Sequence, residues 1–225
     1  MIVISSKDCC KQRTELLNTY PHLQVKNQTA DGICIAGKIL VRGHPEYISL
    51  CREYDIEIYI RLNSDSLPHV REIGRKVRRN YSHISQDGTL CLATDTDIRL
   101  HFREEFNLAK WMKSYVEPFF WTYEYFCRYG VFPAGERSHG AEGILEFYKE
   151  HFQLEDTIQA LDVIKYIAQI EYKGHHKCPC GSNLRLRNCH GSTISNAQKD
   201  MFLFELIEQD LAYIRKEKGE VGRNI

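Results

Sequence analysis

Four potential metal ligands lie close together in the last quarter of the sequence, in the pattern C-x-C-x8-C-H: Cys178, Cys180, Cys189 and His190. Thiolate and imidazole are the ligands that zinc prefers, and four of them complete its tetrahedral shell. Because a closed shell has no open position for water, the pattern predicts a structural zinc site and not a catalytic one. Gly181, directly after the second ligand, favours the tight turn that such close spacing requires.

A second residue with chemical potential is Cys91, in the segment HISQDGTLCLAT that spans residues 83–94. A cysteine between two leucines is more often a small buried hydrophobe than a nucleophile. The Asp87-Gly88 pair, however, predicts a turn, which places the residues after it at the surface. A thiolate at such a place can act as a nucleophile, for instance by accepting an acyl group and passing it to an amine. The turn therefore favours a catalytic Cys91, with a core cysteine as the alternative.

Several charged side chains close to Cys91 in the sequence would assist such chemistry. A free thiol has a pKa of about 8.5, and Arg78, Arg79 or His83 would lower it by favouring the thiolate. Asp95 and Asp97 follow the cysteine closely, where a carboxylate would orient an incoming amine. The alternative for these two acids is a solvated acidic loop. The other cysteines of this region are expected to be packed and unreactive: Cys9, Cys10, Cys34, Cys51 and Cys127.

The elements that must position these residues follow from hydrophobic periodicity. Apolar residues alternate over 32–41 and 56–62, which is the period of half-buried strands, and a shorter strand is expected near 70–73. Asp8 is expected to cap the first helix, and Pro118 to break or kink a later one. Strands followed by helices indicate an α+β fold. Helices are expected over residues 8–20, 107–129, 141–152, 156–170 and 195–218.

The composition narrows the class of protein. The 225 residues are 43% hydrophobic and 27% charged, which excludes a wholly disordered or fibrous chain. Lys and Arg together number 30, as do Asp and Glu, so a protein that mainly coats nucleic acid or an anionic membrane is disfavoured. No apolar run approaches the ~18 residues of a membrane span, and the N-terminus does not resemble a signal peptide. The nine cysteines are odd in number and unevenly spaced, which favours a reducing, cytoplasmic location over a disulfide-linked secreted protein.

The stretch CPCGSNLRLRNCHG closely resembles the SEC-C zinc motif, in which C-P-C-G-S is followed by a basic stretch and a Cys-Cys or Cys-His pair. The resemblance assigns residues 174–191 to this motif and implies a small zinc-binding appendage, by analogy one that docks a partner. Because the motif occurs on many unrelated proteins, it implies no particular activity.

The region around Cys91 resembles the ubiquitin-conjugating (UBC) fold. In that family a helix and a four-stranded antiparallel meander precede the active cysteine, which follows an H-P-N tripeptide and an N-G or D-G turn. The matching features are His83, the Asp87-Gly88 turn, residues 89–92 around the cysteine, and Pro68 before the fourth strand. Ser85 stands where the family has its asparagine. The resemblance implies a UBC-like domain with flanking helices over residues 1–135, and a helical extension over 136–225 that carries the zinc motif.

The same resemblance implies an activity and its partners. Cys91 would take a protein C-terminus as a thioester from an activating enzyme and transfer it to an acceptor lysine. Relatives in bacterial anti-phage defence operons attach a ubiquitin-like protein or, in one branch, the C-terminus of a cyclic-nucleotide synthase. Two alternatives are open: a non-catalytic UBC-like scaffold, and a zinc-dependent nucleic-acid adaptor that uses Arg75, Lys76, Arg78, Arg79, Arg185 and Arg187. Zero net charge argues against the adaptor, so neither nucleic acid nor a membrane is an expected partner.

Overall fold

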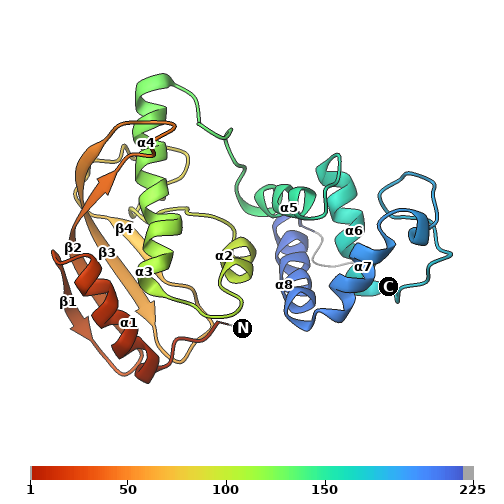
Figure 1. Ribbon diagram of the computed structural model, residues 1–225, viewed down its shortest axis with the longest axis horizontal. Helices are drawn as coiled ribbons and strands as arrows, with labels where there is room; N and C mark the ends of the chain where they lie inside the picture. Colours follow the sequence, from red (N-terminus) through yellow and green to blue (C-terminus); the bar gives the residue numbers. More distant parts are fainter. Residues whose placement is uncertain (1, 220–225) are drawn as a thin grey trace. The chain divides into compact units, whose positions relative to one another are not determined.

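The computed structural model describes residues 2–219 of the chain (Figure 1). These residues form two compact units: an N-terminal unit that ends at Glu136 and a C-terminal unit that begins at Arg137. The sequence places the corresponding division after residue 135.

A four-stranded antiparallel sheet organises the N-terminal unit, with strand order β1-β2-β3-β4 (Figure 1). The strands are β1 (Leu23–Gln28), β2 (Gly32–Arg42), β3 (Cys51–Arg61) and β4 (His69–Glu72). The alternation predicted over 32–41 and 56–62 is confirmed, since Ile35 of β2 pairs with Ile58 of β3 and both side chains are buried. Periodicity does not reveal β1, because Leu23 is the only buried residue of that strand.

Helices pack against this sheet and complete an α+β architecture (Figure 1). They are α1 (Ser6–Thr19), α2 (Asp95–His101), α3 (Leu108–Trp111), a π-helical turn (Met112–Val116) and α4 (Glu117–Tyr129). Buried residues of the strands, α1 and α4 form one core, in which Tyr54 stacks on Phe120 with ring centroids 4.1 Å apart. The expectation that Asp8 caps the first helix is wrong. Ser5 is the N-cap and accepts a hydrogen bond from the Asp8 amide, so α1 begins about one turn earlier.

Pro118 lies just after the π-helical turn, at the start of α4. Proline has no N–H to donate, and its ring collides with the carbonyl of the preceding turn in a regular α-helix. The wider π-helical turn accommodates both effects, so the chain stays helical from residue 108 to residue 129. The predicted break is therefore a local change of helix type.

The C-terminal unit consists mainly of helices. They are α5 (Gly140–His151), α6 (Thr157–Gln169), a 3-10 turn η2 (Leu186–Asn188), α7 (Gly191–Lys199) and α8 (Met201–Glu217). A buried hydrogen bond of 2.8 Å from Tyr148 to Asp210 joins α5 to α8. The prediction of a single helix over 195–218 is wrong, because Asp200 ends α7 and caps α8 by accepting from the Leu203 amide. Within residues 2–219, no helix combines the length and apolarity needed to cross a membrane.

Candidate functional sites

Cys91 ends one arm of a short β-hairpin that spans residues 83–91. The Cys91 N–H donates a hydrogen bond of 2.9 Å to the His83 carbonyl. Next to this pair, Ile84 and Leu90 form an antiparallel bridge, and both side chains are buried. The eight-residue separation of His83 and Cys91 in the sequence thus becomes a direct pairing across the hairpin.

The hairpin is attached to the main sheet. The Glu72 N–H donates to the Gly88 carbonyl at 2.9 Å, and the Leu90 N–H donates to the Val70 carbonyl at 2.8 Å. Gly88, at the turn, has a φ of +90°, and a Cβ atom there would lie 2.8 Å from the Glu72 carbonyl oxygen. Only glycine adopts this positive φ readily and also avoids the close contact with the Glu72 carbonyl. The cysteine therefore follows a strand-like arm that β4 holds in place.

The Cys91 side chain is exposed, and a ring nitrogen of His83 lies within 4.8 Å of its sulfur. Protein atoms nevertheless displace enough water around the sulfur to raise the pKa of the thiol above its ordinary value. The expectation that Arg78, Arg79 or His83 lowers this pKa is wrong, since burial raises it. The Arg79 guanidinium instead donates to the Glu72 carbonyl at 3.2 Å. The resting thiol is thus held in its protonated form.

Two aromatic rings contact the His83 imidazole. The centroid of Tyr81 lies 5.4 Å from that of His83, and the centroid of Phe132 lies 5.3 Å away in an edge-to-face arrangement. Tyr81 also stacks on Phe132, at 6.0 Å, so the three rings form one group. This packing limits the orientations that His83 can adopt beside Cys91. Sequence reasoning missed Phe132 because it lies 49 positions after His83 along the chain, and it missed Tyr81 because no motif marks that residue.

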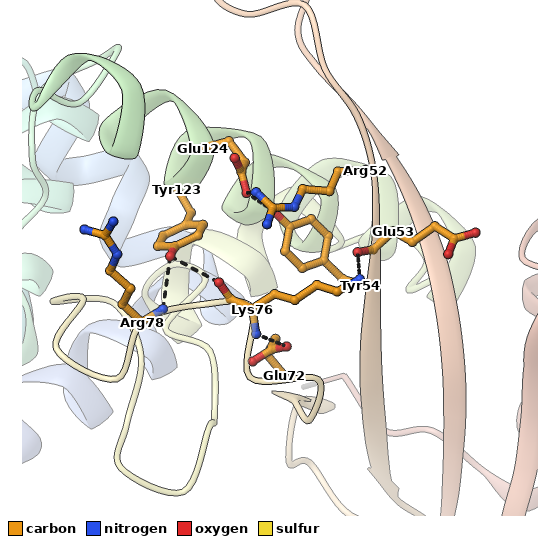
Figure 2. A network of polar contacts seen from close by, with 8 residues as sticks. All are labelled: Arg52, Glu53, Tyr54, Glu72, Lys76, Arg78, Tyr123 and Glu124. Carbon is orange, nitrogen blue, oxygen red and sulfur yellow. Dashed lines mark hydrogen bonds and ion pairs between the residues drawn. The ribbon is translucent and has the colours of Figure 1, made fainter.

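A polar network fixes the loop between β4 and the hairpin (Figure 2). Tyr123 of α4 accepts a hydrogen bond from the Arg78 amide at 3.1 Å and donates one to the Lys76 carbonyl at 3.2 Å. The Lys76 ammonium donates to the Glu53 carbonyl on β3, at 2.7 Å, and its amide donates to the buried Glu72 carboxylate, at 3.0 Å. Some residues of the basic run 75–80 therefore have a structural role.

Asp95 and Asp97 both lie in the first turn of α2, which Thr94 caps. Acidic residues at this position interact favourably with the helix dipole. The Asp95 carboxylate is also 4.0 Å from the guanidinium of Arg99, one turn along the helix. These features give Asp95 a structural role. A role for either acid toward an incoming amine stays a prediction.

The expectation that the other cysteines of this unit are packed is wrong in part. Cys9 is buried and Cys34 is half-buried, as expected. Cys10, Cys51 and Cys127 are exposed, because they lie on outward faces of α1, β3 and α4. Thiol reagents can therefore reach sites besides Cys91, and an experiment on Cys91 has to remove these three.

The four ligands predicted for zinc come together in the C-terminal unit. The sulfur atoms of Cys178, Cys180 and Cys189 and the Nδ1 atom of His190 all lie within 4.8 Å of one another. Three of the separations are given by the pairs Cys178–His190 at 3.4 Å, Cys180–Cys189 at 3.5 Å and Cys189–His190 at 3.2 Å. A tetrahedral site with Zn–S near 2.3 Å and Zn–N near 2.0–2.1 Å requires separations of roughly 3.5–3.8 Å. The four groups could thus hold a metal ion with small adjustments.

Short loops around the ligands explain how they converge. Lys177 and Arg185 form an antiparallel bridge, and the Cys178 amide donates to the Leu184 carbonyl at 2.8 Å. Between these arms, Gly181 has a φ of +79°, in the left-handed region that the predicted tight turn requires. The last two ligands follow the η2 turn and lead into α7. The convergence of these four residues and the turn at Gly181 were therefore predictable from the sequence.

Comparison with known proteins adds no relative. No known protein family matches the chain, and no curated protein or solved structure shows a match.

Proposed function

We propose that this protein is a ubiquitin-conjugating-like transferase in which Cys91 carries a protein C-terminus as a thioester. The observation that carries the proposal is the exposed thiol of Cys91, placed beyond the last strand of the sheet and paired with His83 across a hairpin. A core cysteine, the alternative considered for this residue, would not expose its side chain. The proposed metal is zinc, held by the four ligands of the C-terminal unit in a structural role.

The order of elements in the N-terminal unit supports the proposal. A helix precedes an antiparallel meander of four strands, Pro68 directly precedes β4, and the cysteine hairpin comes before the next helix. The UBC-like family has this order. The turn before the cysteine also supports the proposal, because its Gly88 adopts a conformation that other residues rarely tolerate.

The chemistry consists of two acyl transfers. In the first, the Cys91 sulfur attacks the carbonyl carbon of an incoming thioester, a new C–S bond forms, and the donor sulfur leaves with the proton that Cys91 gives up. In the second, a lysine nitrogen attacks the same carbon, a C–N bond forms, and the Cys91 sulfur leaves as the amine loses a proton. Because one thioester replaces another, the first step needs little driving force. The protein has to position the partners and assist proton transfer.

Within the N-terminal unit, His83 is placed to assist that proton transfer. The raised pKa of Cys91 means that the thiol must lose its proton as it reacts. The His83 ring nitrogen, within 4.8 Å, offers a base close to the sulfur. Its contacts with Tyr81 and Phe132 hold the ring near the place where it is needed.

The proposed partners follow from the resemblance to the UBC family. They are an activating enzyme, a ubiquitin-like protein or the C-terminus of a cyclic-nucleotide synthase, and an acceptor lysine, in the cytoplasm of a bacterium that defends itself against phages. A non-catalytic UBC-like scaffold is the second candidate, and one observation favours it: burial raises the Cys91 pKa and so disfavours the reactive thiolate.

The test supplies the acyl group directly. Ubiquitin with a C-terminal mercaptoethanesulfonate thioester, or a glycine-ended peptide with the same thioester, is incubated with a variant in which the exposed Cys10, Cys51 and Cys127 are replaced by Ser. We expect an adduct on a gel that dithiothreitol removes, since thiolates cleave thioesters. The matched variant with Cys91→Ala should form none. An adduct that persists without Cys91, or no adduct with either donor, would contradict the transferase.

A further inference from the structure

Positive charge is concentrated around the metal-ligand cluster. Residues 172–199 contain five cations, Lys173, Lys177, Arg185, Arg187 and Lys199, and no Asp or Glu. The rest of the chain therefore has 25 Lys and Arg against 30 Asp and Glu. The net charge of zero is therefore the sum of a basic segment and an acidic remainder. A divalent ion held by three thiolates and a neutral imidazole would remove only one positive charge from this segment.

Four of these cations share a small region that we call the basic face: Lys173, Lys177, Arg185 and Arg187. Lys177 and Arg185 lie directly opposite each other in the antiparallel bridge. The Arg187 amide donates to the Gly174 carbonyl at 3.2 Å, which places Arg187 beside the segment that carries Lys173. The hydrogen-bonded loops around the ligand cluster therefore hold the four cations close to one another.

The charges of the basic face are not neutralised by neighbours. All four side chains are exposed, and none forms an ion pair with another residue of the described chain. Like charges directly opposite each other in a bridge are destabilising. The pairing of Lys177 with Arg185 therefore costs stability in the isolated protein, and an anion placed between them would relieve that repulsion.

The basic run of the N-terminal unit differs from this face. The Lys76 ammonium and the Arg79 guanidinium both donate to backbone carbonyls, at 2.7 Å and 3.2 Å. Those cations hold a loop in place. Of the cations that sequence reasoning offered for nucleic-acid binding, Lys76 and Arg79 therefore have structural roles, whereas Arg185 and Arg187 belong to the basic face, to which the fold adds Lys173 and Lys177.

We propose that the basic face binds the phosphate backbone of a nucleic acid. The neighbouring exposed side chains Ser182, Asn183 and Asn188 add polar groups of the kind that contact phosphates. An acidic protein segment is the other class of polyanion, but a protein interface needs apolar anchors at its centre. Here Leu184, 50% exposed, is the one large apolar side chain exposed between residues 172 and 199. This proposal is independent of Cys91 and its chemistry.

The test measures binding as a function of salt. A fluorescein-labelled 20-nucleotide single-stranded RNA, and a DNA of the same sequence, are titrated with the full chain between 50 and 200 mM NaCl, with anisotropy as the readout. Each phosphate contact contributes about 0.7 to the slope of log K against log salt for single strands. Four contacts predict a slope near −2.8, so affinity should fall about 50-fold over this range. The two probes distinguish RNA from DNA as the source of the phosphates.

The decisive variant is Lys177→Gln with Arg185→Gln, which removes two charges and keeps long polar side chains. The slope should become shallower, about −1.4, so the affinity of this variant should decrease only about 7-fold across the same salt range. The matched control is Lys110→Gln with Lys113→Gln, which removes two exposed charges from the N-terminal unit and should leave the slope unchanged. Metal content measured on both variants by native mass spectrometry shows whether the ligand cluster is intact.

Three outcomes would overturn the proposal. They are no binding to either probe at 50 mM NaCl, an equal loss of binding in the control variant, and tighter binding to a labelled polyglutamate peptide of similar charge. The last result would assign the basic face to an acidic protein segment.

Discussion

Cys91 and His83 face each other across a hairpin: the cysteine N–H donates to the histidine carbonyl at 2.9 Å, and the sulfur lies within 4.8 Å of a ring nitrogen. The main chain thus sets the distance between the two side chains. Because β4 holds the hairpin from the other side, this distance depends on backbone hydrogen bonds and not on a flexible loop. A thiol and a base that act together need such a fixed separation, and the proposed role of His83 relies on it.

The first prediction concerns the pH dependence of Cys91 reactivity. Burial raises its thiol pKa, so the thiolate should appear at higher pH than in a free cysteine, whose pKa is about 8.5. In a Cys10→Ser, Cys51→Ser, Cys127→Ser background, the iodoacetamide rate at pH 7 should be below that of N-acetylcysteine and should rise past pH 8.5. Subtracting the rate of the additional Cys91→Ala variant isolates this thiol. A midpoint at or below that of N-acetylcysteine would contradict the pKa shift.

The second prediction concerns the hairpin turn. Gly88→Ala adds a Cβ atom 2.8 Å from the Glu72 carbonyl at a φ of +90°, and we expect a loss of about 2–3 kcal/mol in the free energy of unfolding. The control is Gly130→Ala, where φ is +72° but no atom lies within 4 Å of the added Cβ. It should cost about 1–2 kcal/mol, from backbone strain alone. Urea unfolding measures both, and equal losses would show that the contact with Glu72 is unimportant.

The third prediction concerns the network in Figure 2. Tyr123→Phe removes the hydroxyl that bridges the Arg78 amide and the Lys76 carbonyl, so both backbone groups lose a partner. We expect a loss of about 1–2 kcal/mol. Tyr125→Phe is the matched control in the same helix, because no hydrogen bond of its hydroxyl is found within residues 2–219. It should change stability by less than about 0.5 kcal/mol. Urea unfolding of the two variants makes the comparison, and similar losses would argue against a role for the bridge.

The fourth prediction concerns the metal. Protein purified without a chelator should contain about one zinc ion per chain by native mass spectrometry, since the four donors complete one tetrahedral shell. Cys180→Ser with Cys189→Ser should abolish binding, whereas Cys127→Ser should leave it unchanged. EDTA should lower the melting temperature by about 5 °C or more if the ion stabilises its loops by at least ~1 kcal/mol. Full zinc content in the double variant would show that other residues bind the ion.

Local patterns in the sequence were enough to predict several features. The alternation of isoleucines specified β2 and β3, because a strand with one buried face repeats every two residues. The spacing of Cys178, Cys180, Cys189 and His190 specified the ligand cluster, since its members lie on connected short turns. The Asp87-Gly88 pair specified the turn before Cys91. Each of these features depends on residues that are close together along the chain.

Only the tertiary structure decided how distant residues act on the candidate site. Phe132 reaches His83, and Tyr123 reaches the loop before the hairpin, through packing between segments far apart in the sequence. The Cys91 pKa was expected to fall because cations lie nearby in the sequence. It rises because protein atoms displace water around the sulfur, and the Arg79 guanidinium, which was expected to lower the pKa, is directed to a backbone carbonyl. Charge and burial at a site depend on which atoms surround it in space, and one-dimensional spacing does not encode that.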